Sequence, residues 1–263
     1  MSLTLTPVNL LTTVKPILLV IVIALLVWRI MALGLSEHYA RKSDSIAIAK
    51  ALSWHPDNPT ALFEQGRLFA EQDPAAAETL LVESISADPT HAQTYLVLAN
   101  LWEKRGLLQQ ATHLITVADD LAPERVPVQL AVAAFWLHQG QLEQALEHWN
   151  IVLGLRPAVR KSLYPFLLEV LTKSEAQVAL TRVLSESPSW WESFFSYVAN
   201  NAKDLNTVRI LYRLMRAQNQ ALNAEQRQHY INRLQREQQW LEAYFVWLNH
   251  LDAKQRKVLG ECV

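Results

Sequence analysis

The chain has 263 residues, a formal net charge of −1 and 19% charged residues. This near-neutral balance excludes the broad basic surface that nucleic-acid binding requires. Six glycines leave little room for phosphate-binding loops, and the single cysteine, Cys262, excludes an intramolecular disulfide framework.

The first patterned segment is an apolar run at residues 16–28 (PILLVIVIALLVW), between Lys15 and Arg29. Apolar residues resume at 30–35, and an arginine inside such a stretch can extend its charged end toward lipid headgroups. Residues 16–35 are therefore long enough to cross about 30 Å of hydrocarbon. We expect a retained transmembrane helix within an N-terminal segment 1–35. A cleaved signal peptide, with the small residues Ala32 and Gly34 before the cleavage site, and a buried soluble helix are the alternatives.

The charges around this run support two opposite orientations of the helix in the membrane. One lysine precedes the span and Arg29, Arg41 and Lys42 follow it, which by the positive-inside rule favours a cytoplasmic body. However, the preceding segment is short, has no acidic residue and ends in Lys15 directly before the run, as in an uncleaved signal anchor. Long C-terminal domains also translocate largely regardless of charge. We therefore expect a single-pass protein of a bacterial inner membrane with its soluble body in the periplasm.

Residues 36–54 are expected to form one helix, with Ile48, Ala51 and Leu52 on a single face. These three residues precede similar residues at 81–85 by 33 positions. The segment therefore resembles the second helix of an incomplete leading repeat. No Gly/Ser/Pro-rich linker separates it from the apolar run, so we expect the repeats to lie close to the bilayer.

Residues 57–157 carry a repeat of about 34 residues. Pro56, Pro89, Pro123 and Pro157 lie 33, 34 and 34 residues apart. Other positions keep this period, namely the small residues Ala77, Ala111 and Ala145, the large residues Leu81, Ile115 and Trp149, and the glycines Gly106 and Gly140. We expect helical hairpins that pair 59–71 with 74–87, 91–105 with 108–121, and 125–139 with 142–156.

These positions resemble the tetratricopeptide repeat (TPR) family, whose pattern is W-x2-L-G-x2-Y…A-x3-F…P. The matches are Leu62, Gly66, Phe69, Ala77, Leu81 and Pro89, then Tyr95, Leu98, Ala99, Trp102, Ala111, Ile115 and Pro123, then Gln129, Val132, Ala133, Trp136, Ala145, Trp149 and Pro157. Gln129 departs from the pattern because it occupies a large apolar position. The resemblance implies an all-α, right-handed α-solenoid over 36–157, in which neighbouring hairpins bury each other's apolar faces. It also implies a protein that binds other proteins rather than an enzyme.

Residues 158–263 keep the helical pattern but lose the period, and we interpret them as divergent repeats. The expected hairpins pair 160–172 with 174–187, 189–201 with 204–219, and 224–237 with 239–251. Asn223 followed by Gln226 is typical of a helix start. In the last hairpin Ala243 takes the small position and Trp247 the large one. No polar capping helix follows, so either the last helix caps the solenoid or the chain is a fragment of a longer protein.

Catalytic and metal-binding patterns are missing from the sequence. The eight histidines are scattered and none has the spacing of a metal site. No nucleophile elbow, phosphate-binding loop or dinucleotide-binding fingerprint is present. We therefore expect no catalytic residue, metal or cofactor.

Aromatic residues offer one alternative function. Trp102, Trp136, Trp149 and Trp247 fall on repeat positions expected in the core, and Trp28 on the membrane interface. Trp190 and Trp191 differ because neighbouring helical residues point about 100° apart, so both cannot easily be buried on one face. They either pack between divergent hairpins or form an exposed aromatic patch that binds a glycan.

The first helices of the hairpins should line a groove. Equivalent positions give one row with Arg67, Asn100 and Ala134 and a second with Glu71, Lys104 and His138. These polar and charged side chains suit an extended peptide, and we expect Arg67, Asn100, Lys104 and His138 to bind the partner.

The sequence therefore predicts a membrane-anchored TPR scaffold or assembly protein. Its partners would be proteins of an envelope complex of the polysaccharide-export, secretion or pilus type, and it would contact the bilayer through one helix. The alternative is a carbohydrate-binding envelope module that uses exposed tryptophans.

Overall fold

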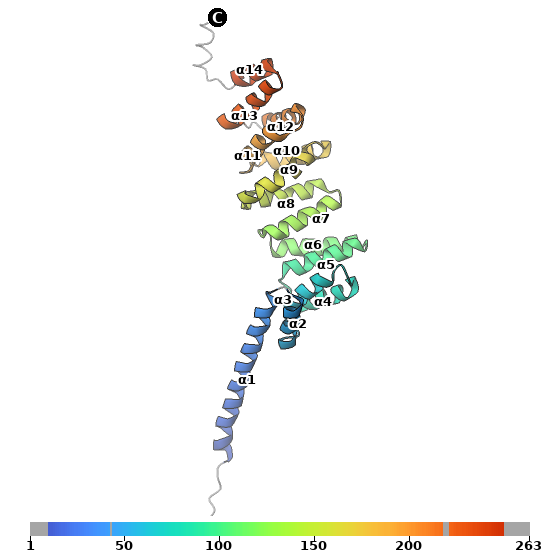
Figure 1. Ribbon diagram of the computed structural model, residues 1–263, viewed down its shortest axis with the longest axis vertical. Helices are drawn as coiled ribbons and strands as arrows, with labels where there is room; N and C mark the ends of the chain where they lie inside the picture. The colour runs from blue at the N-terminus through green and yellow to red at the C-terminus, as the bar shows by residue number, and fades with distance from the viewer. Residues whose placement is uncertain (1–9, 43, 218–220, 250–263) are drawn as a thin grey trace, which may run out of the picture. The chain divides into compact units, whose positions relative to one another are not determined.

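The structure is a computed structural model that describes residues 10–42, 44–217 and 221–249, without the side chains of 10–17, 174 and 175. Within these ranges the chain is helical apart from short turns and contains no strand, which confirms the predicted all-α fold (Figure 1). The chain divides into two compact units, Met1–Leu121 and Ala122–Val263. In each unit, consecutive helices pack together as hairpins.

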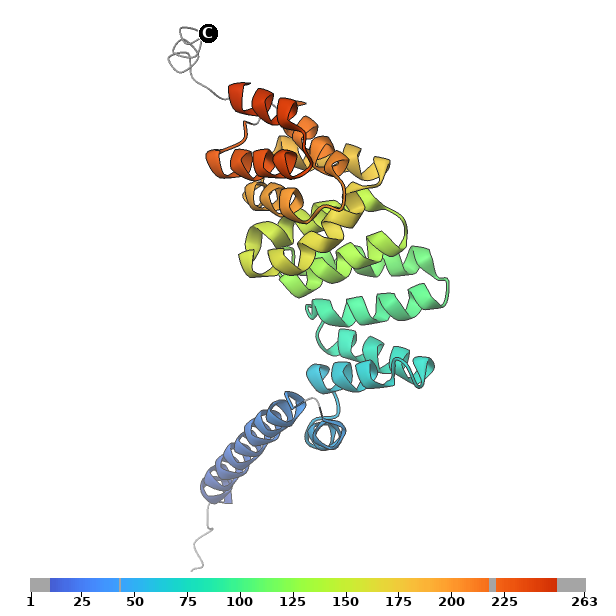
Figure 2. The ribbon, with the colours of Figure 1, turned by 45° about the horizontal axis from the view of Figure 1, so that its top comes forward.

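The first unit consists of three helical hairpins, α1–α2, α3–α4 and α5–α6. Its helices are α1 (Leu10–Ala40), α2 (Ser45–Trp54), α3 (Pro59–Phe69), α4 (Pro74–Ala87), α5 (Ala92–Lys104) and α6 (Leu108–Leu121). The hairpins expected at 59–87 and 91–121 are therefore confirmed, with helix ends that differ by at most two residues. The turned view in Figure 2 shows α2 viewed nearly along its axis, beside the upper end of α1.

The second unit begins with α7 (Val126–His138) and α8 (Leu142–Leu155), which match the third predicted hairpin. The helices that follow are the short 3-10 helix η1 (Pro157–Val159), α9 (Arg160–Leu171), α10 (Ser174–Ser185), α11 (Trp191–Asn201), α12 (Leu205–Ala217), α13 (Ala224–Arg236) and α14 (Trp240–Asn249). The divergent hairpins are thus present although the 34-residue period has faded. Their buried residues form one apolar cluster that extends from α7 to α14.

The prediction of a single helix over 36–54 is wrong. α1 continues without a break to Ala40, the chain turns, and α2 begins at Ser45. The last turns of α1 pack on α2, so they form the first helix of a complete leading hairpin. Ser36 is fully buried, and its Oγ donates to the Ala51 carbonyl at 2.9 Å and accepts from Asn58 Nδ2 at 2.9 Å. The apolar N-terminal helix is therefore continuous with the first hairpin.

Local sequence explains where the helices begin and end. Asn58 and Asp73 accept hydrogen bonds from the backbone N–H groups of Ala61 and Ala76, and a proline follows each cap at the first helical position. Gly106 has φ 79° and Gly140 has φ 71°, so each closes its helix in the left-handed conformation that glycine tolerates best. The predicted start at Asn223 is confirmed as a capping box with Gln226.

The repeat positions fill the core as expected. Ala77, Ala111 and Ala145 are fully buried where paired helices approach each other, and Leu81, Ile115 and Trp149 are at most 6% exposed. Gln129, the departure from the TPR pattern, is also fully buried, but its Oε1 lies 2.7 Å from His148 Nδ1. A hydrogen bond thus offsets the cost of placing this amide in an apolar position.

Trp247 is not a core residue, contrary to the sequence expectation. It is 39% exposed, and Trp240, Leu241, Tyr244 and Phe245 on the same helix are 50% exposed or more. The large position of a hairpin is buried by the hairpin that follows, and no described helix follows α14. Trp102 and Trp136 are half-buried, while Trp149 is buried as predicted.

Candidate partner-binding surfaces

In the first unit, the predicted groove residues lie on the first helices of two successive hairpins. Arg67 on α3 is held by Glu64, with Nη2 and Oε2 at 2.7 Å. Lys104 on α5 pairs with Glu71 of the preceding hairpin at 2.7 Å, and this contact holds the pKa of Glu71 below its usual range. Asn100 is exposed one turn before Lys104. The surface is polar and accessible, but both of its cations already have an acidic partner.

His138 lies at the end of α7 in the second unit, where its side chain is exposed. Its alignment with Lys104 in one row stays a prediction, as does peptide binding by all four residues.

A second polar surface, which the sequence did not reveal, lies between α11 and α13. We call it the α13 groove: an open depression of about 640 Å³ lined by Asn200, His229, Asn232, Gln235 and Arg236. Four of these residues are on α13 at helical spacings of three and four, which places them on one face. The spacing alone could have indicated this face, but without the 34-residue period nothing related it to α11.

The groove presents hydrogen-bonding groups that the described protein does not use. Asn200 Nδ2 contacts His229 Nδ1 at 3.1 Å, and Asn232 Oδ1 accepts from Gln228 Nε2 at 2.8 Å. Within the described ranges, the Asn232 amide N–H₂, the Gln235 amide and the Arg236 guanidinium make no side-chain hydrogen bond or ion pair. A peptide backbone offers the complementary C=O and N–H groups, so this face can bind an extended segment.

A buried arginine fixes the geometry of the groove. Arg233 is 6% exposed, and its Nη1 donates to the Ala202 carbonyl at 2.8 Å, at the C-terminal end of α11. Its Nε donates to Glu237 Oε1 at 3.1 Å. A cation at this position satisfies a helix-terminal carbonyl and pairs with a carboxylate, so it fastens α13 to α11.

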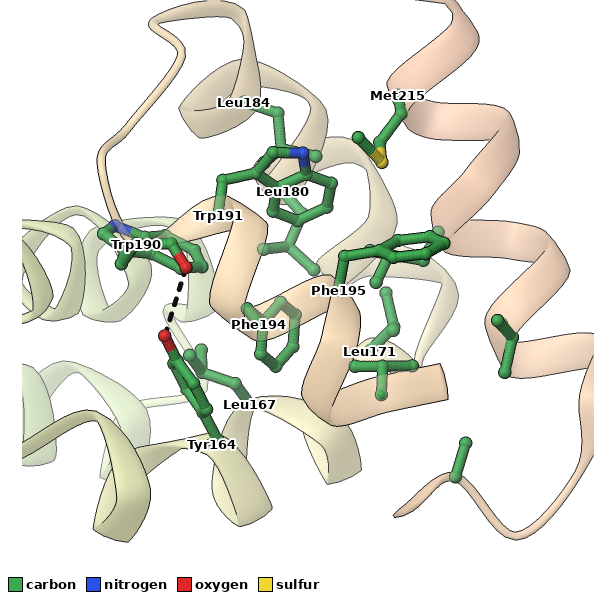
Figure 3. Packing of buried hydrophobic residues seen from close by; sticks show 14 of the residues in the cluster. Tyr164, Leu167, Leu171, Leu180, Leu184, Trp190, Trp191, Phe194, Phe195 and Met215 are labelled. Carbon is green, nitrogen blue, oxygen red and sulfur yellow. Dashed lines mark hydrogen bonds between the residues drawn. The ribbon is translucent and has the colours of Figure 1, made fainter. Parts of the chain in front are cut away.

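Trp190 and Trp191 do not form an exposed patch, so that hypothesis is wrong. They are 1% and 3% exposed and pack with Phe194 inside the second unit (Figure 3). Trp190, at the cap of α11, has near-helical backbone angles (φ −90°, ψ −12°). The two rings therefore point in different directions, but both are buried because α11 packs against α9, α12 and α13. The Trp190 indole donates to Asn150 Oδ1 at 2.8 Å. The alternative of glycan binding through these two rings loses its physical basis.

Among the described residues, no group of three or more His, Cys, Asp and Glu side chains is arranged to hold a metal ion. The residues of the α13 groove also include no carboxylate or nucleophile beside a general base.

The described part of α1 is long and apolar enough to cross a membrane. An 18-residue window within its segment Leu18–Ala40 has a mean hydropathy of 2.7, and this window is not buried by the described protein. Leu18, Ile21 and Ile30 are each at least 50% exposed. The ring of Trp28 lies 5.8 Å from that of Trp54 at the end of α2. The described residues thus leave the apolar surface of α1 uncovered on the N-terminal side of its contact with α2.

Comparison with known proteins gives little further information. No family model and no curated protein matches the chain. A solved structure described as the functional characterization of Pseudomonas aeruginosa PilF is 15% identical, and the match covers 85% of this chain and 98% of that one, with a TM-score of 0.42. At this similarity the likeness carries no argument about function.

Proposed function

We propose that this protein is a membrane-anchored helical-repeat scaffold that binds an extended peptide of a partner protein. The observation that carries the proposal is the α13 groove, where Asn232, Gln235 and Arg236 present unused polar groups from a helix fixed by the buried Arg233. The helix backbone that carries these groups is already fixed, so only their exposed side chains lose conformational freedom on binding. Arg236 makes an acidic side chain or a C-terminal carboxylate the preferred neighbour of the bound backbone.

The anchor in this proposal is α1, retained in the mature protein. A signal peptidase cut before Leu35 would remove most of α1 and leave only residues 35–40 to pack on α2. Ser36 and Ala40 are both fully buried in the leading hairpin, and Ser36 is bonded to Ala51 and Asn58. Both residues would remain after that cut, but Trp28, whose ring lies 5.8 Å from that of Trp54 at the end of α2, would be lost. This lost contact is the support for an uncleaved anchor over a signal peptide.

The setting we propose is the periplasmic face of a bacterial inner membrane, in an envelope complex for polysaccharide export, secretion or pilus assembly. The support is architectural: one apolar helix leads directly into the first helical hairpin, so the repeats begin close to the bilayer. The single cysteine, Cys262, provides a test of sidedness. A membrane-impermeant maleimide should label it in cells with a permeabilised outer membrane. Labelling only after the inner membrane is lysed would place the repeats in the cytoplasm.

Affinity capture from detergent-solubilised membranes tests partner binding. The triple variant Asn232→Ala, Gln235→Ala and Arg236→Ala should lose the partner that the parent captures, with unchanged helical content. The triple variant Arg67→Ala, Asn100→Ala and Lys104→Ala tests whether the surface of the first unit contributes to the same interaction. Because all these side chains are surface residues, each change should cost no more than about 0.5 kcal/mol of stability. Full capture by both variants would refute a groove-bound peptide.

A further inference from the structure

The second unit contains two buried hydrogen-bond donors that the protein itself does not use. The indole Nε1 of Trp191 and the amide Nε2 of Gln226 are buried and have no hydrogen-bond partner within the described ranges. Their residues are 3% and 1% exposed. A buried donor without an acceptor costs about 1–3 kcal/mol, so two beside one another need an explanation.

Both residues line the same pocket, which has a volume of about 240 Å³. Trp191 contributes from the start of α11 and Gln226 from the first turn of α13, and Met215 of α12 also lines the pocket. In Figure 3 the ring nitrogen of Trp191 is on the side of the indole that faces Met215. The two donors therefore belong to one site.

The orientation of the Gln226 amide is fixed by the fold. Its Oε1 accepts from the backbone N–H of Asn223 at 2.8 Å in the capping box, so its N–H₂ is the end left over. Two buried donors, from two different elements, thus belong to residues that line this pocket. Glu192, which lines the same pocket, adds a carboxylate that accepts hydrogen bonds and repels anions. Met215 and Pro188 supply apolar wall.

We propose that this pocket binds a carboxamide side chain, an asparagine or glutamine of a bound peptide. The carboxamide oxygen has two lone pairs and accepts from Trp191 and Gln226, while its N–H₂ donates to Glu192. A carboxylate of the same shape would accept from the same donors but would meet the charge of Glu192. This inference rests on the proposed function, because it names one side chain of the peptide that the scaffold binds.

The pocket is distinct from the α13 groove, since the two share no lining residue. Trp190 provides a matched control for Trp191. It is the neighbouring tryptophan, it is equally buried, and its indole already donates to Asn150.

The test uses the full chain in detergent with ¹⁵N-labelled tryptophan indoles, and two probes, N-acetylglutamine methylamide and N-acetylglutamate methylamide. The Trp191→Phe and Trp190→Phe variants assign the two indole signals. The glutamine probe should shift the Trp191 signal saturably and leave that of Trp190 in place. The glutamate probe meets the charge of the exposed Glu192 carboxylate and cannot donate to it, so it should bind several-fold more weakly. In Glu192→Gln this preference should disappear.

Two results would overturn the proposal. The first is a Trp191 signal that does not respond saturably to the glutamine probe, which means that the donors bind water only. The second is an equal response to both probes in the parent chain. In either case, loss of partner capture by the Asn232, Gln235 and Arg236 triple variant would still support peptide binding in the α13 groove, so failure of the pocket and failure of the scaffold function are distinguishable.

Discussion

Gly66 tests the packing of the repeat because it is the small residue at which α3 meets α4. A Cβ at this position would lie 2.9 Å from Leu81 Cγ, 3.0 Å from Leu81 Cδ2 and 3.4 Å from the Ala77 carbonyl oxygen. Leu81 is fully buried, and the nearest atom is its branch point rather than a flexible end. Gly66→Ala therefore forces two helices apart at the contact that defines the hairpin.

The magnitude follows from two opposing terms. Alanine is better than glycine in a helix interior by about 1 kcal/mol. Overpacking of a filled core costs about 1–3 kcal/mol, so the net effect of Gly66→Ala is a destabilisation of roughly 0–2 kcal/mol. Gly154, inside α8, has no atom within 4 Å of an added Cβ. Gly154→Ala should thus show only the better helix propensity of alanine and stabilise its hairpin by about 1 kcal/mol.

Hydrogen exchange, measured for peptides of α3–α4 and of α7–α8 in the full chain, gives these local free energies of opening. The local readout is needed because repeat proteins need not unfold in one step. In a Leu81→Ala background the clash is absent, so there Gly66→Ala should become stabilising. Equal stabilisation by Gly66→Ala and Gly154→Ala in the parent chain would refute the proposed close contact.

Three further perturbations test other parts of the structure. Gln238 has φ 59° and closes α13 as Gly106 and Gly140 close α5 and α7. Because glycine adopts this conformation without strain, Gln238→Gly should raise the free energy of opening of α13, measured by hydrogen exchange, by about 1 kcal/mol, and an unchanged value would contradict this. Hydrogen bonds from Arg209, and then from Tyr230, hold the pKa of Glu242 below its usual range despite partial burial; the stability from this contact is therefore present above the unfolded pKa of about 4.3 and is lost as the pH falls through the lower folded value. In the Glu242→Gln chain the stability of α12–α14, measured by hydrogen exchange, should fall less as the pH is lowered. The same pH profile as in the parent chain would exclude this role. Ser36→Ala leaves Asn58 Nδ2 without its acceptor and should cost about 1–3 kcal/mol in the first hairpin, whereas Ser53→Ala, at an exposed serine bonded to Lys50, should cost little; equal effects in hydrogen exchange would refute the buried network.

The sequence predicted most of the fold because the repeat acts through local, periodic signals. Proline at helix starts, glycine in left-handed turns and alanine at close contacts each specify one backbone feature, and all recur at a period near 34. The prediction of one helix over 36–54 is wrong because this segment lacks such local signals. The segment between Ala40 and Ser45 contains neither proline nor glycine. The first helix of the leading hairpin is the end of the apolar helix that was expected to lie in the membrane.

The candidate site could be predicted only in part. The rule that first helices line a groove led to Arg67, Asn100 and Lys104, but it could not show that Glu64 and Glu71 already pair with Arg67 and Lys104. The α13 groove depends on which face of α13 meets α11, and this follows from the side chain of Arg233 reaching the end of α11. The unused donors of Trp191 and Gln226 arise from the packing of three elements, for which a sequence pattern has no signal.

The most direct test of the scaffold account is site-specific photo-cross-linking in intact membranes. A benzoylphenylalanine replaces Asn232, which is exposed in the α13 groove, and in a control chain it replaces Val178, which is 75% exposed on α10. The account predicts one dominant cross-linked protein from position 232, mapped by mass spectrometry to a single segment, and only background from position 178. Equal cross-linking at both positions, or none at 232 while the protein remains in the membrane, would contradict it.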